Sequence, residues 1–199
     1  MLTGVLLSLE VLPLSKVEPT WIVCGRLRHS AVPDGLVDWL WDKGSLTAKL
    51  RRVCPGRFAV NLLHQGWGRS LYSEERLLGM RHGTRAIVRE VELQCDGVPW
   101  VYARTLIPAT SLRGGARRLA MLGTKPLGEV LFSDPNVVRD TMEIARLQPR
   151  HKLFTAAMAS QAVIPGQIWG RRTLFHLAGA PLLVNEIFLP TLGQCAVEG

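Results

Sequence analysis

The stretch RAIVREVELQCDGVPWVYARTLIP, residues 85–108, decides the fold, because it has the pattern of two long strands joined by a tight turn. The dipeptide Asp96-Gly97 between two runs rich in β-branched and aromatic residues is a strong signal for a two-residue hairpin. Counting outward from such a turn places Arg89 directly opposite Arg104. The sequence therefore predicts an antiparallel hairpin with one arginine on each strand at the same level.

Arg89 is a charge on an otherwise apolar strand face. Side chains alternate along a strand, so Arg89 shares one face with Ile87, Val91 and Leu93. A buried charge without a partner costs several kcal/mol. We therefore expect Arg89 to have either a buried partner or a ligand.

A second buried charge lies in PLLVNEIFLP, residues 181–190, an apolar run with Glu186 near its centre. In an extended chain Glu186 shares a face with Leu182 and Val184, and the other face is largely apolar as well. Taken alone, Glu186 is either half of a structural ion pair, with Arg172 or another neighbour, or part of a binding site.

The other strand patterns define the fold class. Every connection between them suits antiparallel pairing, which predicts an α+β fold with about six antiparallel strands and helical connections. A chain of 199 residues with 47% hydrophobic content can build one sizeable core, so we expect a single domain over residues 1–199. The further strand segments are residues 58–67, 137–147, 169–179 and 181–189.

Helical signals lie between the strands. Asp34 and Ser45 are both good capping residues, so residues 34–53 predict a helix-turn-helix hairpin. A further helix is expected at residues 114–122, and Pro126 fits the first position of another.

Composition narrows the classes of partner and site. Twenty-four Lys and Arg against sixteen Asp and Glu leave a formal charge of +8, which favours an anionic partner. The five histidines and four cysteines show no metal-ligand spacing or CxxC pair, so we expect no metal site and reduced, cytosolic thiols. The apolar residues 1–14 lack a basic region and are too short to span a bilayer, so we expect a cytoplasmic protein without stable membrane insertion. The cysteines are Cys24, Cys54, Cys95 and Cys195.

Several of these segments together resemble the bacterial chorismate lyase family. The resemblance implies a six-stranded antiparallel sheet and an internal ligand pocket beneath helix-turn-helix lids. It also implies a cofactor-free lyase that cleaves chorismate to 4-hydroxybenzoate and pyruvate in ubiquinone biosynthesis. The segments that carry it, in the order of the family, are DWLWDKGSLTAKL, REVELQCDGVPWVYARTLIP, LGTKPLGEVLF, RDTMEIAR and WGRRTLFHLAGAPLLVNEIFLP.

The resemblance also implies site residues. It places the family's ligand-contacting arginine at Arg89 and its glutamate at Glu186, which are the two expected catalytic residues. Leu127, through its main-chain N–H, and Leu46, in the lid, are the further expected contacts with the substrate. From the hairpin register, Arg104 is a candidate for binding the second carboxylate of chorismate.

Parts of the chain depart from the family. Residues 1–30 match it poorly and predict a loosely structured lead-in with at most one short strand. Residues 147–168 are an insertion, long for a hairpin loop and expected to be partly helical. Arg171 and Arg172 alternate in direction, so at most one of them reaches an interior pocket, and such pairs are usually surface charge.

Two other functions compete with the lyase. The same fold serves as a small-ligand sensor in some transcription regulators, so binding without turnover is the main alternative. The basic residues between 113 and 125 lack interleaved aromatic side chains, so we do not expect a nucleic-acid partner. We expect a monomer that binds chorismate and 4-hydroxybenzoate.

Overall fold

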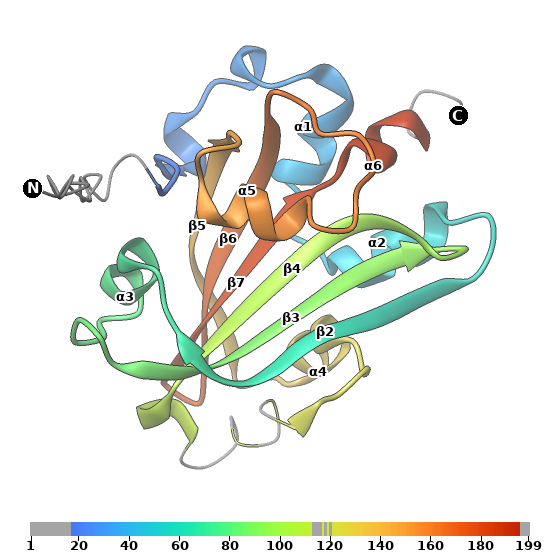
Figure 1. Ribbon diagram of the computed structural model, residues 1–199. Coiled ribbons are helices and arrows are strands. Elements are labelled where there is room, and N and C mark those ends of the chain that lie inside the picture. The colour runs from blue at the N-terminus through green and yellow to red at the C-terminus, as the bar shows by residue number, and fades with distance from the viewer. Residues whose placement is uncertain (1–16, 113–116, 118, 120, 196–199) are drawn as a thin grey trace, which may run out of the picture.

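The computed structural model describes residues 17–112, 117, 119 and 121–195 and confirms the α+β class. Its centre is a seven-stranded antiparallel sheet in the order β1-β5-β6-β7-β4-β3-β2 (Figure 1). The sheet has one strand more than the sequence predicted, because a two-residue strand in the lead-in pairs with β5 at the sheet edge. The strands are β1 (Ile22–Val23), β2 (Phe58–Arg69), β3 (Arg85–Cys95), β4 (Val98–Pro108), β5 (Val137–Leu147), β6 (Ile168–Leu177) and β7 (Ala180–Phe188).

The helices are short and lie in the connections. The predicted helix-turn-helix is confirmed as α1 and α2, and Ser45 Oγ accepts a hydrogen bond from the Ala48 N–H at 3.3 Å. Pro126 is the residue before α4 rather than its first residue, and α3 lies where only a polar connection was predicted. The helix expected at residues 114–122 falls largely outside the described residues. The helices are α1 (Asp34–Leu40), α2 (Leu46–Val53), α3 (Tyr72–Leu77), α4 (Leu127–Ser133), α5 (Lys152–Ala157, in the insertion) and α6 (Pro190–Cys195).

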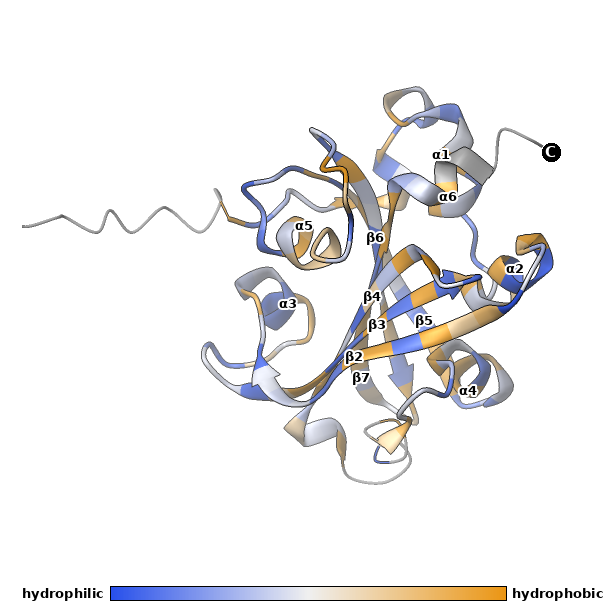
Figure 2. Ribbon diagram, turned by 45° about the vertical axis from the view of Figure 1, so that its right-hand side comes forward, coloured by the Kyte–Doolittle hydropathy of each residue, from blue (hydrophilic) through white to orange (hydrophobic). Residues whose placement is uncertain are grey.

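Helices cover both faces of the twisted sheet. Helices α2 and α4 lie against one face, and α3 and α5 lie against the other (Figures 1 and 2). On the first face Trp39 and Leu50 pack with residues of β3, β4 and β7. On the second face Phe154 packs with Tyr102 and Ile187. The central strands are therefore covered on both sides, so the charged side chains that they carry need a partner or a ligand.

The hairpin between β3 and β4 differs from the predicted register by one residue. Asp96 and Gly97 form the expected turn, with φ of +48° and +79°. Gln94 pairs with Pro99, but Leu93 pairs with Val101, so Trp100 is an extra residue on β4. Beyond this bulge every partner moves by one, because a bulge places two residues opposite one.

This bulge overturns one predicted pairing. Arg89 lies opposite Thr105, and Arg104 lies opposite Glu90 instead of Arg89. Directly opposed residues of an antiparallel pair point to the same face. Arg104 and Arg89 therefore point to opposite faces of the sheet, and Arg104 faces α3.

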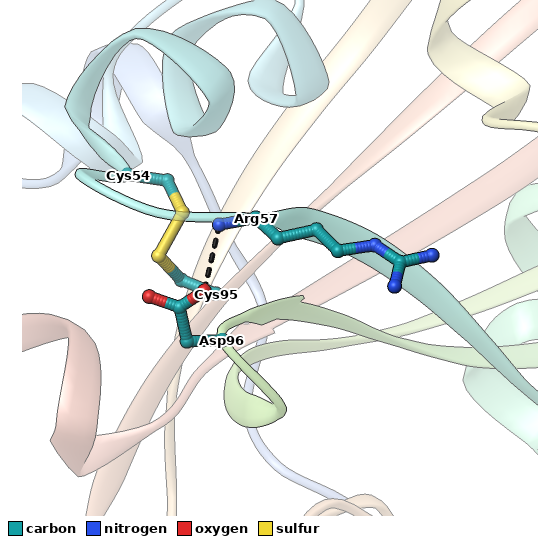
Figure 3. The surroundings of a disulfide bond; sticks show 4 residues. All are labelled: Cys54, Arg57, Cys95 and Asp96. Carbon is teal, nitrogen blue, oxygen red and sulfur yellow. Dashed lines mark hydrogen bonds between the residues drawn. A yellow bond between two sulfur atoms is a disulfide. The ribbon is translucent and has the colours of Figure 1, made fainter.

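The prediction of four reduced thiols was wrong for two of them. Cys54 and Cys95 form a disulfide, with their Cα atoms 5.7 Å apart and a sequence separation of 41 (Figure 3). Cys54 caps the C-terminal end of α2, and Cys95 ends β3 beside it. No sequence pattern predicts this bond, because only the packing of α2 on the sheet brings the two sulfurs together.

The described part of the chain contains neither a membrane-spanning helix nor a cluster of metal ligands. None of its helices combines the length and apolar character needed to cross a bilayer. Nor do its His, Cys, Asp and Glu side chains form a group of three suited to a metal ion.

Candidate active site

A pocket lies between the sheet and helices α2 and α4, and both Arg89 and Glu186 line it. It offers about 50 Å³ to the centres of water molecules, which is room for more than one water. Most of its walls are apolar, and the charged side chains among them belong to Arg89, Arg139 and Glu186. The site thus combines a small enclosed space with a few fixed charges, as ligand sites commonly do.

The register of the sheet explains why these side chains share one pocket. Arg89 pairs with Thr105, which pairs with Val184, which in turn pairs with Thr173. These residues form a row across β3, β4, β7 and β6, and all of them line the pocket. Glu186 lies two residues from Val184 and so points to the same face.

Arg89 is 3% exposed and is held by main-chain carbonyls. Its Nη2 donates to Gly123 O at 2.9 Å and to Lys125 O at 3.0 Å, and its Nε donates to Gly123 O at 3.3 Å. Burial lowers the pKa of Arg89. No carboxylate of the described residues pairs with this guanidinium, and its Nη1 has no acceptor among them. Arg89 is therefore a fixed cation that can accept an anionic ligand.

Glu186 is paired with Arg171, its direct neighbour across β6 and β7. Nε of Arg171 donates to Oε2 of Glu186 at 2.5 Å. Nη1 of Arg171 donates to Trp39 O at 2.8 Å and also to Asp42 O. Arg171 thus fixes the carboxylate and ties the end of α1 to the sheet. Within the described chain, no group donates a hydrogen bond to Oε1 of Glu186.

These contacts correct two readings of the arginine pair. The partner of Glu186 is Arg171, not Arg172, and neither arginine is surface charge, because they are 2% and 5% exposed. As alternation requires, only one of them is on the pocket face. Arg172 points to the other face, where its Nε donates to Glu143 Oε2 at 2.6 Å.

Leu46 and Leu127 both line the pocket, as the resemblance implies, and both are buried. Leu46 begins α2, and Leu127 begins α4. The two helices approach closely at Gly128, where an added Cβ would lie 3.3 Å from both Ser45 Oγ and Thr47 Oγ1. A glycine at this position lets the two helix starts close one side of the pocket.

Arg104 does not line the pocket, so its predicted contact with the ligand is wrong. Its Nε donates to Glu74 Oε1 at 3.1 Å, and its Nη1 donates to Glu90 Oε1 at 2.7 Å. Asn185 adds a hydrogen bond to the same Glu74 oxygen at 3.0 Å. Arg104 is therefore part of a neutralised ion network on the opposite face.

Arg139 is a pocket residue that the sequence analysis missed. It lies on β5 opposite Phe175, and its guanidinium carbon is 5.2 Å from the ring centres of Phe132 and Phe175. Its Nη1 and Nη2 donate to the carbonyl oxygens of Lys43 and Gly44, just before α2. The sequence signal for Arg139 was an arginine near the start of a predicted strand, directly after the apolar Val138.

Comparison with known proteins identifies the family of the chain. The pattern of the family described as "Chorismate lyase" matches residues 17–196. A "Probable chorismate pyruvate-lyase" of Methylococcus capsulatus is 42% identical over 154 residues, covering 77% of this chain and 94% of that protein. One of the same description from Azoarcus sp. is 44% identical over 158 residues, covering 77% and 83%.

Solved structures show the same fold at low identity. PhnF from Mycobacterium smegmatis is similar with a TM-score of 0.54 and 15% identity, covering 76% of this chain and 66% of that one. Its effector domain alone gives a TM-score of 0.50, also at 15% identity, and covers 74% and 90%. At this identity the likeness concerns the fold alone.

Proposed function

The chain belongs to the chorismate lyase family, and from this premise we propose that it cleaves chorismate to 4-hydroxybenzoate and pyruvate in the pocket beneath α2 and α4. The observation that carries the proposal is the pocket itself. Arg89, a buried guanidinium, and Glu186, a half-buried carboxylate, both line it and are not paired with each other. Direct contact between the two without a cavity would instead have favoured a structural ion pair.

The reaction makes limited demands on the protein. The C–O bond between the ring and the enolpyruvyl group breaks, and the ring carbon that bears the hydroxyl loses its hydrogen. The ring becomes aromatic, and the enolpyruvyl group gains the hydrogen and leaves as pyruvate. The products together contain the atoms of the substrate, so the chemistry requires no oxidant, water or cofactor. Orientation and fixed charges can supply most of the catalysis.

Arg89 binds the ring carboxylate in this proposal. The carbonyls of Gly123 and Lys125 fix its side chain in advance, so little conformational entropy is lost on binding. Its Nη1 has no acceptor among the described residues and can donate a hydrogen bond to the carboxylate. The main-chain N–H of Leu127 supplements it, since the first N–H groups of a helix have no partner within the helix. Arg89 and Leu127 then hold one end of the ring.

Glu186 receives the ring hydroxyl at the other end. Arg171 occupies Oε2, which leaves Oε1 to accept a hydrogen bond from the hydroxyl. This contact orients the carbon that loses its hydrogen and places a base within reach of it. Arg171 contributes by holding the carboxylate in one position, and it is therefore a positioning residue.

In this proposal two short helices open to admit the substrate and close over it. The walls that can part are the starts of α2 and α4, which carry Leu46 and Leu127. We propose that they act as the lid and exclude water once the substrate is bound.

The test is to incubate the purified protein with chorismate and to measure pyruvate and 4-hydroxybenzoate. We expect equal amounts of both products. Binding of chorismate without release of pyruvate would overturn the lyase and favour the sensor.

We further propose a single domain over residues 1–199 that works as a cytoplasmic monomer and supplies 4-hydroxybenzoate for ubiquinone biosynthesis. Gel filtration with light scattering tests the monomer.

A further inference from the structure

The pocket contains a second cation, Arg139, that no carboxylate neutralises by contact. Glu186 and Asp42 lie near enough to raise its pKa, but burial and Arg171 lower it more, and the net shift is downward. Among the residues the structure describes, no carboxylate lies within ion-pairing distance of Arg139. A guanidinium has five N–H donors, and the carbonyls of Lys43 and Gly44 account for only two hydrogen bonds.

Several contacts fix the position of this guanidinium. The rings of Phe132 and Phe175 each lie 5.2 Å from it, within the range of cation–π contact. The carbonyls of Lys43 and Gly44 hold its tip against the loop that precedes α2. A half-buried cation that is fixed, unneutralised within the described residues and lining a cavity is suited to an anion from outside the chain.

Arg89 and Arg139 reach the pocket from opposite sides. Arg89 is on β3 and Arg139 is on β5, with β4, β7 and β6 between them. Four strand intervals correspond to about 19 Å across a flat sheet. Both long side chains point inward from these ends, because both line the same pocket. The two guanidinium groups therefore approach the same pocket from opposite ends of this row of strands.

We propose that Arg139 binds the enolpyruvyl carboxylate of chorismate, the role that was predicted for Arg104. This inference rests on the proposed function and adds to it the residue that recognises the leaving group. Chorismate has two carboxylates and 4-hydroxybenzoate has one. Arg139 therefore distinguishes substrate from product, whereas Arg89 binds both.

The test compares substrate and product binding in the full chain. Arg139→Gln should raise the KM for chorismate about 10- to 150-fold, the usual range for a lost charge-assisted hydrogen bond. Arg139→Lys should recover part of this loss. The dissociation constant of 4-hydroxybenzoate should change less than about twofold, because the product lacks the enolpyruvyl carboxylate and so loses no charge-assisted hydrogen bond. Arg146→Ala, on the exposed side of the same strand, is the matched control and should leave both constants unchanged.

Each other outcome overturns the inference. An unchanged KM would show that Arg139 does not bind the substrate. An equal rise in both constants would show that it acts only by holding the Lys43–Gly44 loop. If Arg139→Gln does not fold, a chorismate ester neutral at the enolpyruvyl carboxylate tests the unchanged protein, and equal affinity for ester and chorismate refutes the role. If the unchanged protein releases no pyruvate, the proposed function itself has failed.

Discussion

Removing the disulfide between Cys54 and Cys95 is expected to lower the free energy of unfolding by about 4 kcal/mol. The bond closes a loop with a sequence separation of 41. In the chain-entropy model, restricting an unfolded loop of this length is worth about 4 kcal/mol at 25 °C. This is a large share of the roughly 5–15 kcal/mol by which domains are stable, so the oxidised form should be much more resistant to urea.

The measurement is urea unfolding of the oxidised chain and of the double variant Cys54→Ser/Cys95→Ser. Cys24→Ser is the matched control, since Cys24 is a free cysteine, and it should leave the urea midpoint almost unchanged. The oxidised chain with dithiothreitol should unfold like the double variant. A loss below about 1 kcal/mol would refute the reasoning, because it falls well under the typical value for a disulfide. Titration of free thiol at both positions would refute the bond itself.

The same bond bears on the pocket. It fixes the C-terminal end of α2 to β3, while the start of that helix supplies Leu46 and Thr47 to the pocket wall. The double variant should therefore bind 4-hydroxybenzoate more weakly, as measured by isothermal titration calorimetry. Unchanged affinity would mean that packing alone holds α2 in place.

Three further outcomes are expected. Glu186→Gln should fold normally but lose most of its pyruvate release, and normal release would rule out the assigned role. Arg89→Ala should weaken binding of 4-hydroxybenzoate about 10- to 150-fold, and unchanged affinity would contradict it. Burial raises the pKa of Glu75, but hydrogen bonds from His82, Ser70 and Gly83 outweigh it and hold the pKa below 4.5. Glu75 should therefore stabilise the fold above pH 4.5 and lose this contribution as the pH falls. The measurement is urea unfolding of Glu75→Gln and of the unchanged chain on both sides of pH 4.5. The reasoning is wrong if the difference between their free energies of unfolding does not change with pH.

The sequence was sufficient for the local turn but not for the whole hairpin. Asp96-Gly97 predicted the turn because only a few residues accept two successive positive φ angles. The bulge at Trp100 has no comparable signal, since it depends on how β4 meets β7 and the helices around it. One extra residue was enough to move Arg104 to the opposite face.

The pairing of Glu186 with Arg171 was within reach of the sequence. Ala178 and Gly179 form a two-residue turn, with φ of +50° and +81°. Counting outward from it, as for the other hairpin, leads directly to Arg171 opposite Glu186. The disulfide was not within reach, because it depends on elements that are distant in sequence.

Charge matching on the two faces of the sheet separates structural arginines from those expected to bind a ligand. On the α3 face, Arg104 meets Glu74 and Glu90, and Arg172 meets Glu143. Those cations are neutralised within the protein, so an anion there would have to displace a buried carboxylate at considerable cost. On the pocket face, Arg171 is matched by Glu186, but Arg89 and Arg139 have no described carboxylate in contact. A dianionic substrate would neutralise the excess positive charge of the pocket, so the missing carboxylate partners, rather than burial alone, mark the site.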